Sequence, residues 1–487
     1  MKHTLIKLII FAIGFTSCQS TNTTGPYFAT GIKIGEVSQS EAIVWVRLTE
    51  NPVRIGMDAP LIEVKYKNTE TYELIERKGR PDLTPVVIYP EDHSIKTIQG
   101  ASPGAEGKVR LKYKVKSEKE WKQMDWQSVL PENDFTYQFK LSELLAGNEY
   151  SLIVEASPVK GKIISASLEG KFKTAPSPDV PSDVNFIVTT GTSYPDIDSE
   201  TGYKLYPNSL KLDPEFFVHT GDIIYYDFLG KTFELALWHW DRMYSFQNNI
   251  DFHRQVASYF IKDDHDTWMD DCYLEKETKF MGEFTYEQGT QIFLDEVPMG
   301  EKTYRTISWG KDLQIWLIEG RDYRSPNTMP DGPEKTILGK EQMEWLKTTV
   351  KNSEASYKVL ISPTPIVGPD RPGKNDNYSN SNFKFEGDLL REFLSEQNMV
   401  VVCGDRHWQY ISKDAETGLL EFSCGPGSNA HAGGWSQDNK LPEHIYLNVV
   451  GGFLEGTVSR IDGIPMLIFR HYNPDGDFLN EYVMESK

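Results

Sequence analysis

The 487-residue chain carries a net charge of −20 and contains no basic block, which argues against a nucleic-acid-binding groove because such grooves need clustered Lys and Arg. Its length indicates roughly two or three domains, and its content of 39% hydrophobic and 12% aromatic residues indicates that most of the chain folds. An acidic chain can still take a phosphate substrate, because bound metal ions reverse the local field.

The N-terminus is predicted to be a targeting segment rather than part of the fold. Residues 1–7 are basic, and residues 8–15 form an apolar core that is too short to span a bilayer. Cys18 follows small residues directly after this core, an arrangement that looks like a bacterial lipobox. This resemblance implies a signal peptide over residues 1–17, a lipid on the Cys18 thiol and a tether over residues 18–26. We therefore expect an exported lipoprotein that is anchored to a membrane and faces the periplasm or the cell surface. The alternative is ordinary signal cleavage nearby, with Cys18 incidental.

Residues 27–174 are predicted to form a β-sandwich. Segments of alternating apolar and polar residues indicate strands with one buried face, at 41–48, 107–115, 136–141 and 150–154. Residues 144–150, a Leu and a Gly followed by Tyr150, resemble the corner of fibronectin type III domains. We expect an immunoglobulin-like or fibronectin-like domain without a catalytic cluster. Residues 70–105, which are rich in Pro and Gly, are expected to form a long loop insertion in it.

A Pro-rich linker at residues 175–183 separates this module from residues 184–487, where strands alternate with helices. The expected strands are at 184–190, 313–318, 358–361, 445–450, 456–461 and 466–471, and the expected helices at 233–246, 340–351 and 386–397. This mixture is typical of an α/β sandwich with mixed sheets. Cys403 and Cys424 lie on expected strands, either bridged in an oxidising compartment or as buried free thiols.

Three strand-like runs, at residues 216–219, 259–262 and 399–403, each end in acidic residues. The side chains that follow them are Asp222 and Tyr225; Asp263, Asp264, His265 and Asp266; and Asp405 and His407. Because ligands bind just past the carboxyl ends of strands in open α/β sheets, we expect these side chains to converge on a metal site. A phenolate beside a carboxylate suits a hard, highly charged ion such as Fe(III). The alternative is a set of scattered helix caps and ion pairs.

Taken together, these stretches resemble the alkaline phosphatase D (PhoD-like) family of metallophosphoesterases. The resemblance covers most of the chain, from the exported N-terminus and the β-sandwich module to three motifs: Gly221-Asp222-x-x-Tyr225, Asp263-Asp-His-Asp266 and Gly404-Asp405-x-His407. It implies a calcineurin-like metallophosphoesterase fold, an α/β sandwich with mixed sheets, over residues 184–487.

The resemblance also implies two metal ions, Fe(III) plus Ca, with Zn, Mn or Mg as alternatives. Asp222 would bridge both ions. Tyr225 and His407 would bind the first ion, and Asp264 and Asp405 would bind the second.

The chain departs from the family pattern at the first strand of this second domain. The family carries a Cys ligand there, whereas residues 189–193 read Thr-Thr-Gly-Thr-Ser, without a thiolate. Either Thr192 or Ser193 contributes an oxygen to the first metal, or a water molecule fills the position.

The expected reaction is the hydrolysis of a phosphomonoester or phosphodiester, small or polymeric, by a water molecule that two metal ions activate. His265 would protonate the leaving oxygen or stabilise charge on the phosphoryl group, or else act as a buried histidine that orients Asp266. Arg321 would bind phosphate through its forked donors, with an ion pair to the many acids as the alternative.

Four further residues are candidates for supporting roles. Asp263 and Asp266 would hold the metal ligands in place. Asn429 and His431 lie on a Gly-rich loop after an expected strand and would touch the substrate or the second metal.

Two other functions stay open at this point. The first is a phosphatase that forms a covalent phosphoenzyme at Ser193 or Thr192. The second is a non-catalytic surface lipoprotein whose sandwich binds glycan or protein.

Overall fold

The computed structural model describes residues 25–161 and 163–484. The predicted signal peptide and lipidated Cys18 therefore lie outside the described residues. Within the described part of the chain, no helix is both long enough and apolar enough to cross a membrane.

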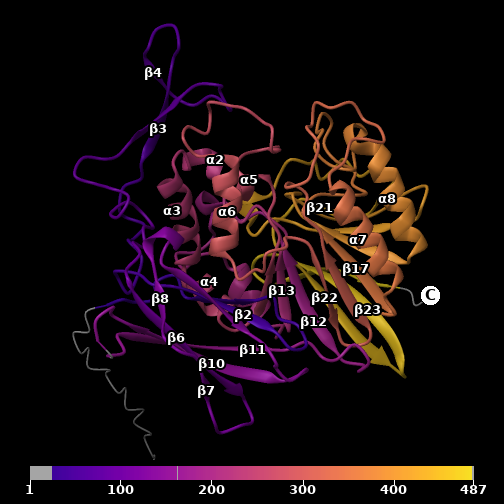
Figure 1. The fold of residues 1–487 in the computed structure, drawn as a ribbon. Coiled ribbons are helices and arrows are strands. Elements are labelled where there is room, and N and C mark those ends of the chain that lie inside the picture. The colour runs from indigo at the N-terminus through magenta and orange to yellow at the C-terminus, as the bar shows by residue number, and fades with distance from the viewer. Residues whose placement is uncertain (1–24, 162, 485–487) are drawn as a thin grey trace, which may run out of the picture.

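Two large sheets form the centre of the molecule (Figure 1). The first has nine strands in the order β24-β23-β22-β12-β13-β14-β1-β2-β9. Its strands are β1 (Ile32–Gly35), β2 (Ala42–Arg47), β9 (Thr136–Leu141), β12 (Val184–Thr189), β13 (Phe216–His219), β14 (Ala257–Phe260), β22 (Phe453–Ile461), β23 (Ile464–Tyr472) and β24 (Phe478–Val483). Strands β12, β13 and β14 are mutually parallel, so their carboxyl ends meet at one edge.

The second sheet has seven strands in the order β15-β16-β17-β18-β20-β19-β21. Its strands are β15 (Arg305–Trp309), β16 (Leu313–Leu317), β17 (Tyr357–Ser362), β18 (Met399–Cys403), β19 (Gln409–Lys413), β20 (Leu420–Cys424) and β21 (His444–Asn448). Strands β16, β17, β18 and β20 run parallel to one another, and the outer strands are antiparallel.

The two sheets pack face to face, and helices cover their outer faces. The helices are α1 (Leu205–Leu210), α2 (Tyr226–Leu229), α3 (Phe233–Tyr244), α4 (Gln247–His253), α5 (Asp264–Thr267), α6 (Tyr286–Glu296), α7 (Gly339–Lys351) and α8 (Lys384–Glu396). In β12, Phe186 and Val188 join the core between the sheets, while Ile187 joins the core under helices α1 to α4 and α6. This alternation follows from the two-residue period of a strand that is buried on both faces. Helices α7 and α8 cover the seven-stranded sheet, where Leu346 and Leu390 pack in one cluster with apolar residues of its strands.

The N-terminal region supplies the remaining sheets. A five-stranded sheet contains β6 (Gly107–Val115), β7 (Lys122–Gln123), β8 (Gln127–Val129), β10 (Glu149–Ser157) and β11 (Ala166–Lys173). It packs against β1, β2 and β9, because Val46, Leu111 and Val154 belong to one buried cluster. Strand β1 also pairs in parallel with β14, so one face of the N-terminal region is part of the nine-stranded sheet.

An arm projects from the N-terminal region beside α2 and α3 (Figure 1). It is a three-stranded sheet of β3 (Glu63–Lys67), β4 (Leu74–Ile75) and β5 (Pro85–Ile88). The sequence predicts a loop insertion at 70–105, and the structure places the short strands β4 and β5 within it. The segment between these strands folds back toward the second domain, as the site below shows.

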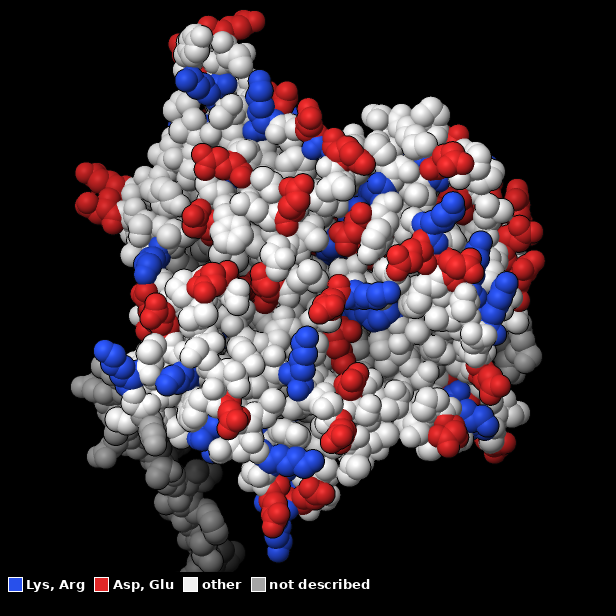
Figure 2. Space-filling model, in the orientation of Figure 1, with Lys and Arg blue, Asp and Glu red and all other residues white. Residues whose placement is uncertain are grey.

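Most elements expected from periodicity are present, with ends displaced by a few residues. Within residues 144–150, the Tyr150 hydroxyl accepts a hydrogen bond from the Leu145 backbone N–H at 2.8 Å. Cys403 and Cys424 are buried free thiols, which decides between the two alternatives for this pair. Figure 2 shows Lys and Arg interspersed with Asp and Glu over one face of the molecule, without a basic block.

Candidate metal centre

The loops after β13 and β14 touch because one of them contains a glycine at the point of contact. Gly221 has φ +110°, and a Cβ on it would lie 2.6 Å from the Asp263 Cβ. Asp222 follows with φ +55°, a conformation that non-glycine residues rarely adopt. This strained turn places Asp222 beside the acids of the next loop, and such strain is concentrated at functional sites.

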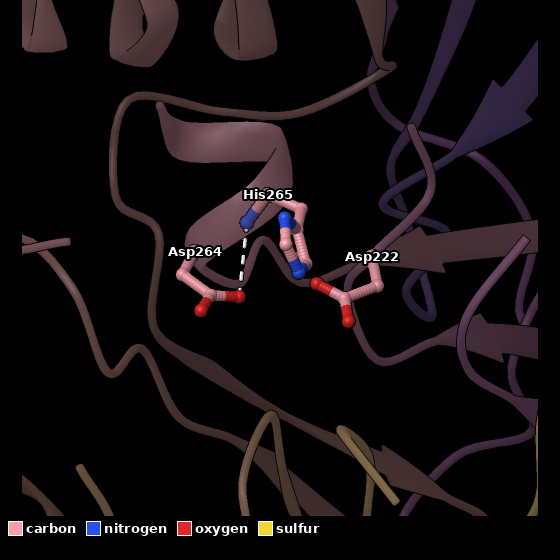
Figure 3. A group of neighbouring side chains, drawn as sticks. All are labelled: Asp222, Asp264 and His265. Atoms are coloured by element: carbon pink, nitrogen blue, oxygen red, sulfur yellow. Dashed lines mark hydrogen bonds between the residues drawn. The ribbon is translucent and has the colours of Figure 1, made fainter. Parts of the chain in front are cut away.

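Acidic side chains from three strand ends converge, but not at the edge of one sheet: β13 and β14 belong to the nine-stranded sheet and β18 to the seven-stranded sheet. Ligand atoms of Asp222, Asp263 and Asp405 lie within 4.8 Å of one another, and so do those of Asp222, Asp264 and His265. Figure 3 shows Asp222 and Asp264 on either side of the His265 ring. Asp222 belongs to both groups, which is the arrangement that a carboxylate shared by two ions requires.

The donor set fits metal ions. Asp222 Oδ1 and Asp263 Oδ2 are buried and have no hydrogen-bond partner among the described residues, whereas Asp405 Oδ2 is paired with Arg406. Burial raises the pKa of Asp222 well above its usual value and that of Asp263 to about 7. Burying unpaired carboxylates is costly unless cations bind them, and oxygen donors of this kind suit hard cations.

A second group of donors surrounds the Tyr225 hydroxyl. This oxygen lies 3.3 Å from Asp222 Oδ2, 3.5 Å from His407 Nε2 and 2.7 Å from His431 Nε2. The far nitrogen of His431, Nδ1, lies 2.9 Å from Asp196 Oδ2. A carboxylate behind a histidine in this way fixes the ring and its tautomer, as it does for metal-bound histidines.

His265 is held by a chain of charged groups that ends in the N-terminal arm. Its Nδ1 lies 2.9 Å from Asp227 Oδ1, and the Arg80 Nε donates to Asp227 Oδ2 at 3.0 Å. Arg80 also pairs with Asp270 at 2.8 Å. Burial alone lowers the pKa of His265, but the carboxylates of Asp227, Asp264 and Asp222 raise it well above its usual value.

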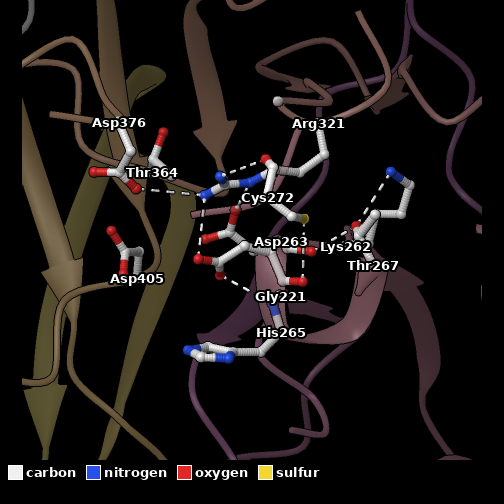
Figure 4. Close-up of polar contacts among 12 residues, drawn as sticks. Gly221, Lys262, Asp263, His265, Thr267, Cys272, Arg321, Thr364, Asp376 and Asp405 are labelled. Atoms are coloured by element: carbon white, nitrogen blue, oxygen red, sulfur yellow. Dashed lines mark hydrogen bonds and ion pairs between the residues drawn. The ribbon is translucent and has the colours of Figure 1, made fainter. Parts of the chain in front are cut away.

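Arg321 lies behind the acids rather than in front of them. Its Nε donates to Asp263 Oδ1 at 2.6 Å, and its Nη2 lies 3.6 Å from Asp376 Oδ2 and 3.9 Å from Asp264 Oδ2. The side chain has no exposed surface, and Figure 4 shows its guanidinium between Asp263 and Asp376. The geometry is therefore that of the ion-pair alternative, in which Arg321 orients metal-binding carboxylates.

Asp266 and Asp405 are fixed by the backbone around them. Asp266 accepts from the backbone N–H groups of Asp222 at 3.3 Å, Ile223 at 3.2 Å and Asp263 at 2.7 Å, so it holds the two touching loops together. The Asp405 N–H donates to Thr190 Oγ1 at 3.2 Å, which joins the ends of β12 and β18. The neighbouring Arg406 pairs with both Asp405 and Asp370.

Hydrogen bonds within the fold involve three of the candidate residues, Thr192, Ser193 and Asn429. Thr192 Oγ1 donates to the Ile223 carbonyl at 2.8 Å. The Ser193 carbonyl accepts from the Tyr203 hydroxyl, and its side chain is buried. Asn429 accepts from the Gly451 N–H at 3.0 Å and braces the loop that carries His431.

Several residues of the site carry no recognisable motif in the sequence. Asp227 falls within the stretch that contains Asp222 and Tyr225, but nothing marks it as the partner of His265. Arg80 and Asp376 are far from the three motifs along the chain and reach them only through the fold. Asp196 contacts His431, which is 235 positions away along the chain, and nothing in the sequence indicates this contact.

Comparison with known proteins gives consistent matches. A model of the family described as PhoD-like phosphatase matches residues 186–446. Alkaline phosphatase D of Bacillus subtilis (strain 168) is 22% identical over 477 residues, covering 83% of this chain and 70% of that protein.

Two solved structures share the fold. A structure of PhoD superposes with a TM-score of 0.71 at 15% identity, over 96% of this chain and 91% of the other. A purple acid phosphatase from yellow lupin (Lupinus luteus) seeds gives a TM-score of 0.62 at 11% identity, over 93% of this chain and 73% of the other.

Proposed function

This chain belongs to the PhoD-like phosphatase family, and from that premise we propose that it hydrolyses phosphate esters with two metal ions held at the ends of β13, β14 and β18. The observation that carries this proposal is the convergence of three buried carboxylates, from Asp222, Asp263 and Asp405, of which Asp222 and Asp263 each keep one oxygen without a hydrogen-bond partner among the described residues. Membership of a phosphatase family and the cluster of carboxylates together support a metal-dependent phosphoesterase.

Asp222 would be shared between the two ions. Tyr225 and His407 would hold the first ion, and Asp264 and Asp405 would hold the second. The hard oxygen donors favour Fe(III) in the first position and Ca in the second, with Zn, Mn or Mg as alternatives.

His431 completes the first position. Its Nε2 is 2.7 Å from the Tyr225 hydroxyl, a separation close to the roughly 3 Å between neighbouring ligand atoms on one ion with bonds of about 2.1 Å. Gly191 leaves room for it, since a Cβ there would lie 3.3 Å from His431 Cδ2. An imidazole oriented by Asp196 would then take the role that the family pattern gives to a thiolate, and neither Thr192 nor Ser193 would be needed as a ligand.

Bound metal ions would supply Lewis-acid activation of the attacking water and neutralise phosphoryl charge. His265, held by Asp227, presents its ring between Asp222 and Asp264 and donates a proton to the leaving oxygen. Arg321 holds Asp263 in place through the hydrogen bond from its Nε. A phosphoenzyme at Thr192 is not favoured, because its hydroxyl is bonded to the Ile223 carbonyl.

Residues 27–174 form a fibronectin-like module in the same proposal, joined by a linker at 175–183 to the phosphatase domain at 184–487. Two observations support this module. Strands β1, β2 and β9 lie in one sheet and pack against a second sheet that contains β6, β10 and β11, and the Tyr150 hydroxyl accepts a hydrogen bond from the Leu145 backbone N–H. A lipid on Cys18 would anchor the protein to a membrane on the exported side, where it meets its phosphate ester.

Metal analysis combined with a panel of phosphate monoesters and diesters tests the function. Asp222→Asn should lose both metal content and activity, because one neutral oxygen cannot replace a shared carboxylate. His431→Ala should lose the first metal and retain the second. Asp179→Asn, an exposed change in the linker, is the matched control and should retain both. Full metal content and turnover in Asp222→Asn would refute the site.

A further inference from the structure

A cavity of about 270 Å³ lies where the N-terminal region meets α3, next to the metal centre. Its walls include Met57 and Gln99 from the N-terminal region, Tyr225 and Phe228 from the segment that follows β13, and His239 and Arg242 from α3. Tyr225 therefore belongs to both places: its hydroxyl lies among the metal-binding side chains, and the residue also lines the cavity.

Two residues that line this cavity each carry a hydrogen-bond donor without a partner among the described residues. Arg242 Nη2 lies 2.9 Å from His239 Nδ1, and because arginine only donates, that nitrogen of His239 accepts. The ring hydrogen of the neutral imidazole is then on Nε2. His239 Nε2 and Arg242 Nε are both buried without a partner among the described residues, in side chains of residues that are 1% and 4% exposed.

The positive charge of Arg242 has no acidic counterpart in the described structure. Arg47, Arg321 and Arg406 are also buried, and each of them pairs with at least one Asp. The Arg242 guanidinium instead lies 4.3 Å from the Tyr194 ring centroid and 4.0 Å from that of Trp238.

Ring stacking occupies the faces of a guanidinium and leaves its in-plane N–H groups free. The nearest other cation, Arg54, donates to the Arg242 carbonyl at 2.8 Å and likewise has no ion pair in the described chain. A buried charge without a counter-charge is costly, and a bound anion would remove that cost.

We propose that this cavity binds a small organic anion, with its carboxylate or phosphate group against Arg242 and His239 and its flat apolar body against Phe228. The body would also contact the apolar wall made by Ile197, Ile224 and Met243. Resting on the proposed function, this anion is part of the leaving group of the ester, since Tyr225 connects the cavity to the metal centre. The enzyme then favours esters whose alcohol carries its own negative charge.

Benzoate binding, measured by calorimetry, and the hydrolysis of two esters, 4-carboxyphenyl phosphate and phenyl phosphate, test this on the full exported chain. Met57→Trp enlarges a side chain in the cavity wall, at a residue that is 42% exposed, so it avoids the folding risk of changing buried Arg242. Val53→Trp, 68% exposed and not in the cavity wall, is the matched control.

We expect benzoate to bind wild type and Val53→Trp, and to bind Met57→Trp at least about tenfold more weakly, as loss of charge-assisted hydrogen bonds implies. The ratio of kcat/KM for the carboxylated ester to that for phenyl phosphate should be about ten or more in wild type and fall toward one in Met57→Trp.

Equal benzoate affinity in all three proteins, or none in wild type, overturns the cavity as an anion site. Binding without any preference between the esters overturns its assignment to the leaving group and leaves a site for a free anion. Binding that Met57→Trp abolishes, in a protein that hydrolyses neither ester, supports the cavity and counts against the proposed function, so the two failures are distinguishable.

Discussion

Arg80 connects the N-terminal arm to the histidine of the metal centre, and removing its guanidinium should slow hydrolysis of esters with poor leaving groups. Asp227 is fully buried and has two cationic partners, His265 at 2.9 Å and Arg80 at 3.0 Å. Arg80→Met preserves the aliphatic stem and leaves Asp227 with His265 alone. Asp227, which orients the His265 imidazole, then loses one of its two cationic partners.

The expected size of the effect follows from these contacts. A hydrogen bond to a charged group contributes about 1.5–3 kcal/mol. The Arg80 side chain is 38% exposed, so solvent screening reduces this to about 1 kcal/mol. That corresponds to a decrease in kcat of about fivefold if the whole loss is expressed in the transition state.

The assay compares phenyl phosphate with 4-nitrophenyl phosphate. Nitrophenolate leaves without a proton, so a defect in His265 should be small for this ester and close to the full effect for phenyl phosphate. Arg80→Lys should recover part of the loss, and Lys78→Met, an exposed change in the same arm, should have no effect. An equal loss on both esters would mean that Arg80 only stabilises the fold, and no loss on either would refute the chain from Arg80 to His265.

Three further predictions concern other parts of the molecule. Tyr225→Phe should remove a visible charge-transfer band and lower activity if the first ion is Fe(III); active, metal-replete protein that contains no iron and shows no such band would exclude it. Cys18→Ser should move the protein from the membrane fraction to the soluble exported fraction, and continued detergent-sensitive attachment would contradict the lipid anchor. Burial lowers the pKa of His471 from 6.5 to about 4. Between these two pH values the unfolded state binds a proton on this ring and the folded state does not, so the free energy of unfolding falls as the pH is lowered from 6.5 to 4. Chemical denaturation of His471→Gln should therefore show a flatter decline in unfolding free energy over this interval, by about 3 kcal/mol, than wild type shows; parallel curves would refute it.

The sequence predicts much of this site because the relevant signal is local. A short buried run followed by an acid marks the end of a strand, and three such ends carry Asp222, Asp264 and Asp405. The sequence does not show that the third end, after β18, belongs to a different sheet from the first two. The alternation that predicts β2 and β6 is equally local. What each charged side chain contacts is decided by neighbours that are remote in the chain, so Arg321 could be read equally as a phosphate ligand or as an ion pair until the fold showed Asp263 and Asp376 around it.

The same limit explains why the N-terminal region looks independent of the catalysis in the sequence. Its strands follow the pattern of a separate sandwich, yet β1 pairs with β14, the strand that ends in Asp263 and the acids after it. Arg47 of β2 pairs with Asp241 of α3, and Arg80 reaches Asp227 from the arm. The loop after β14 is thus supported at its strand by β1 and at its histidine by the arm. Such support from two sides restricts how far His265 can move, and positioning of this kind is what general acid catalysis requires.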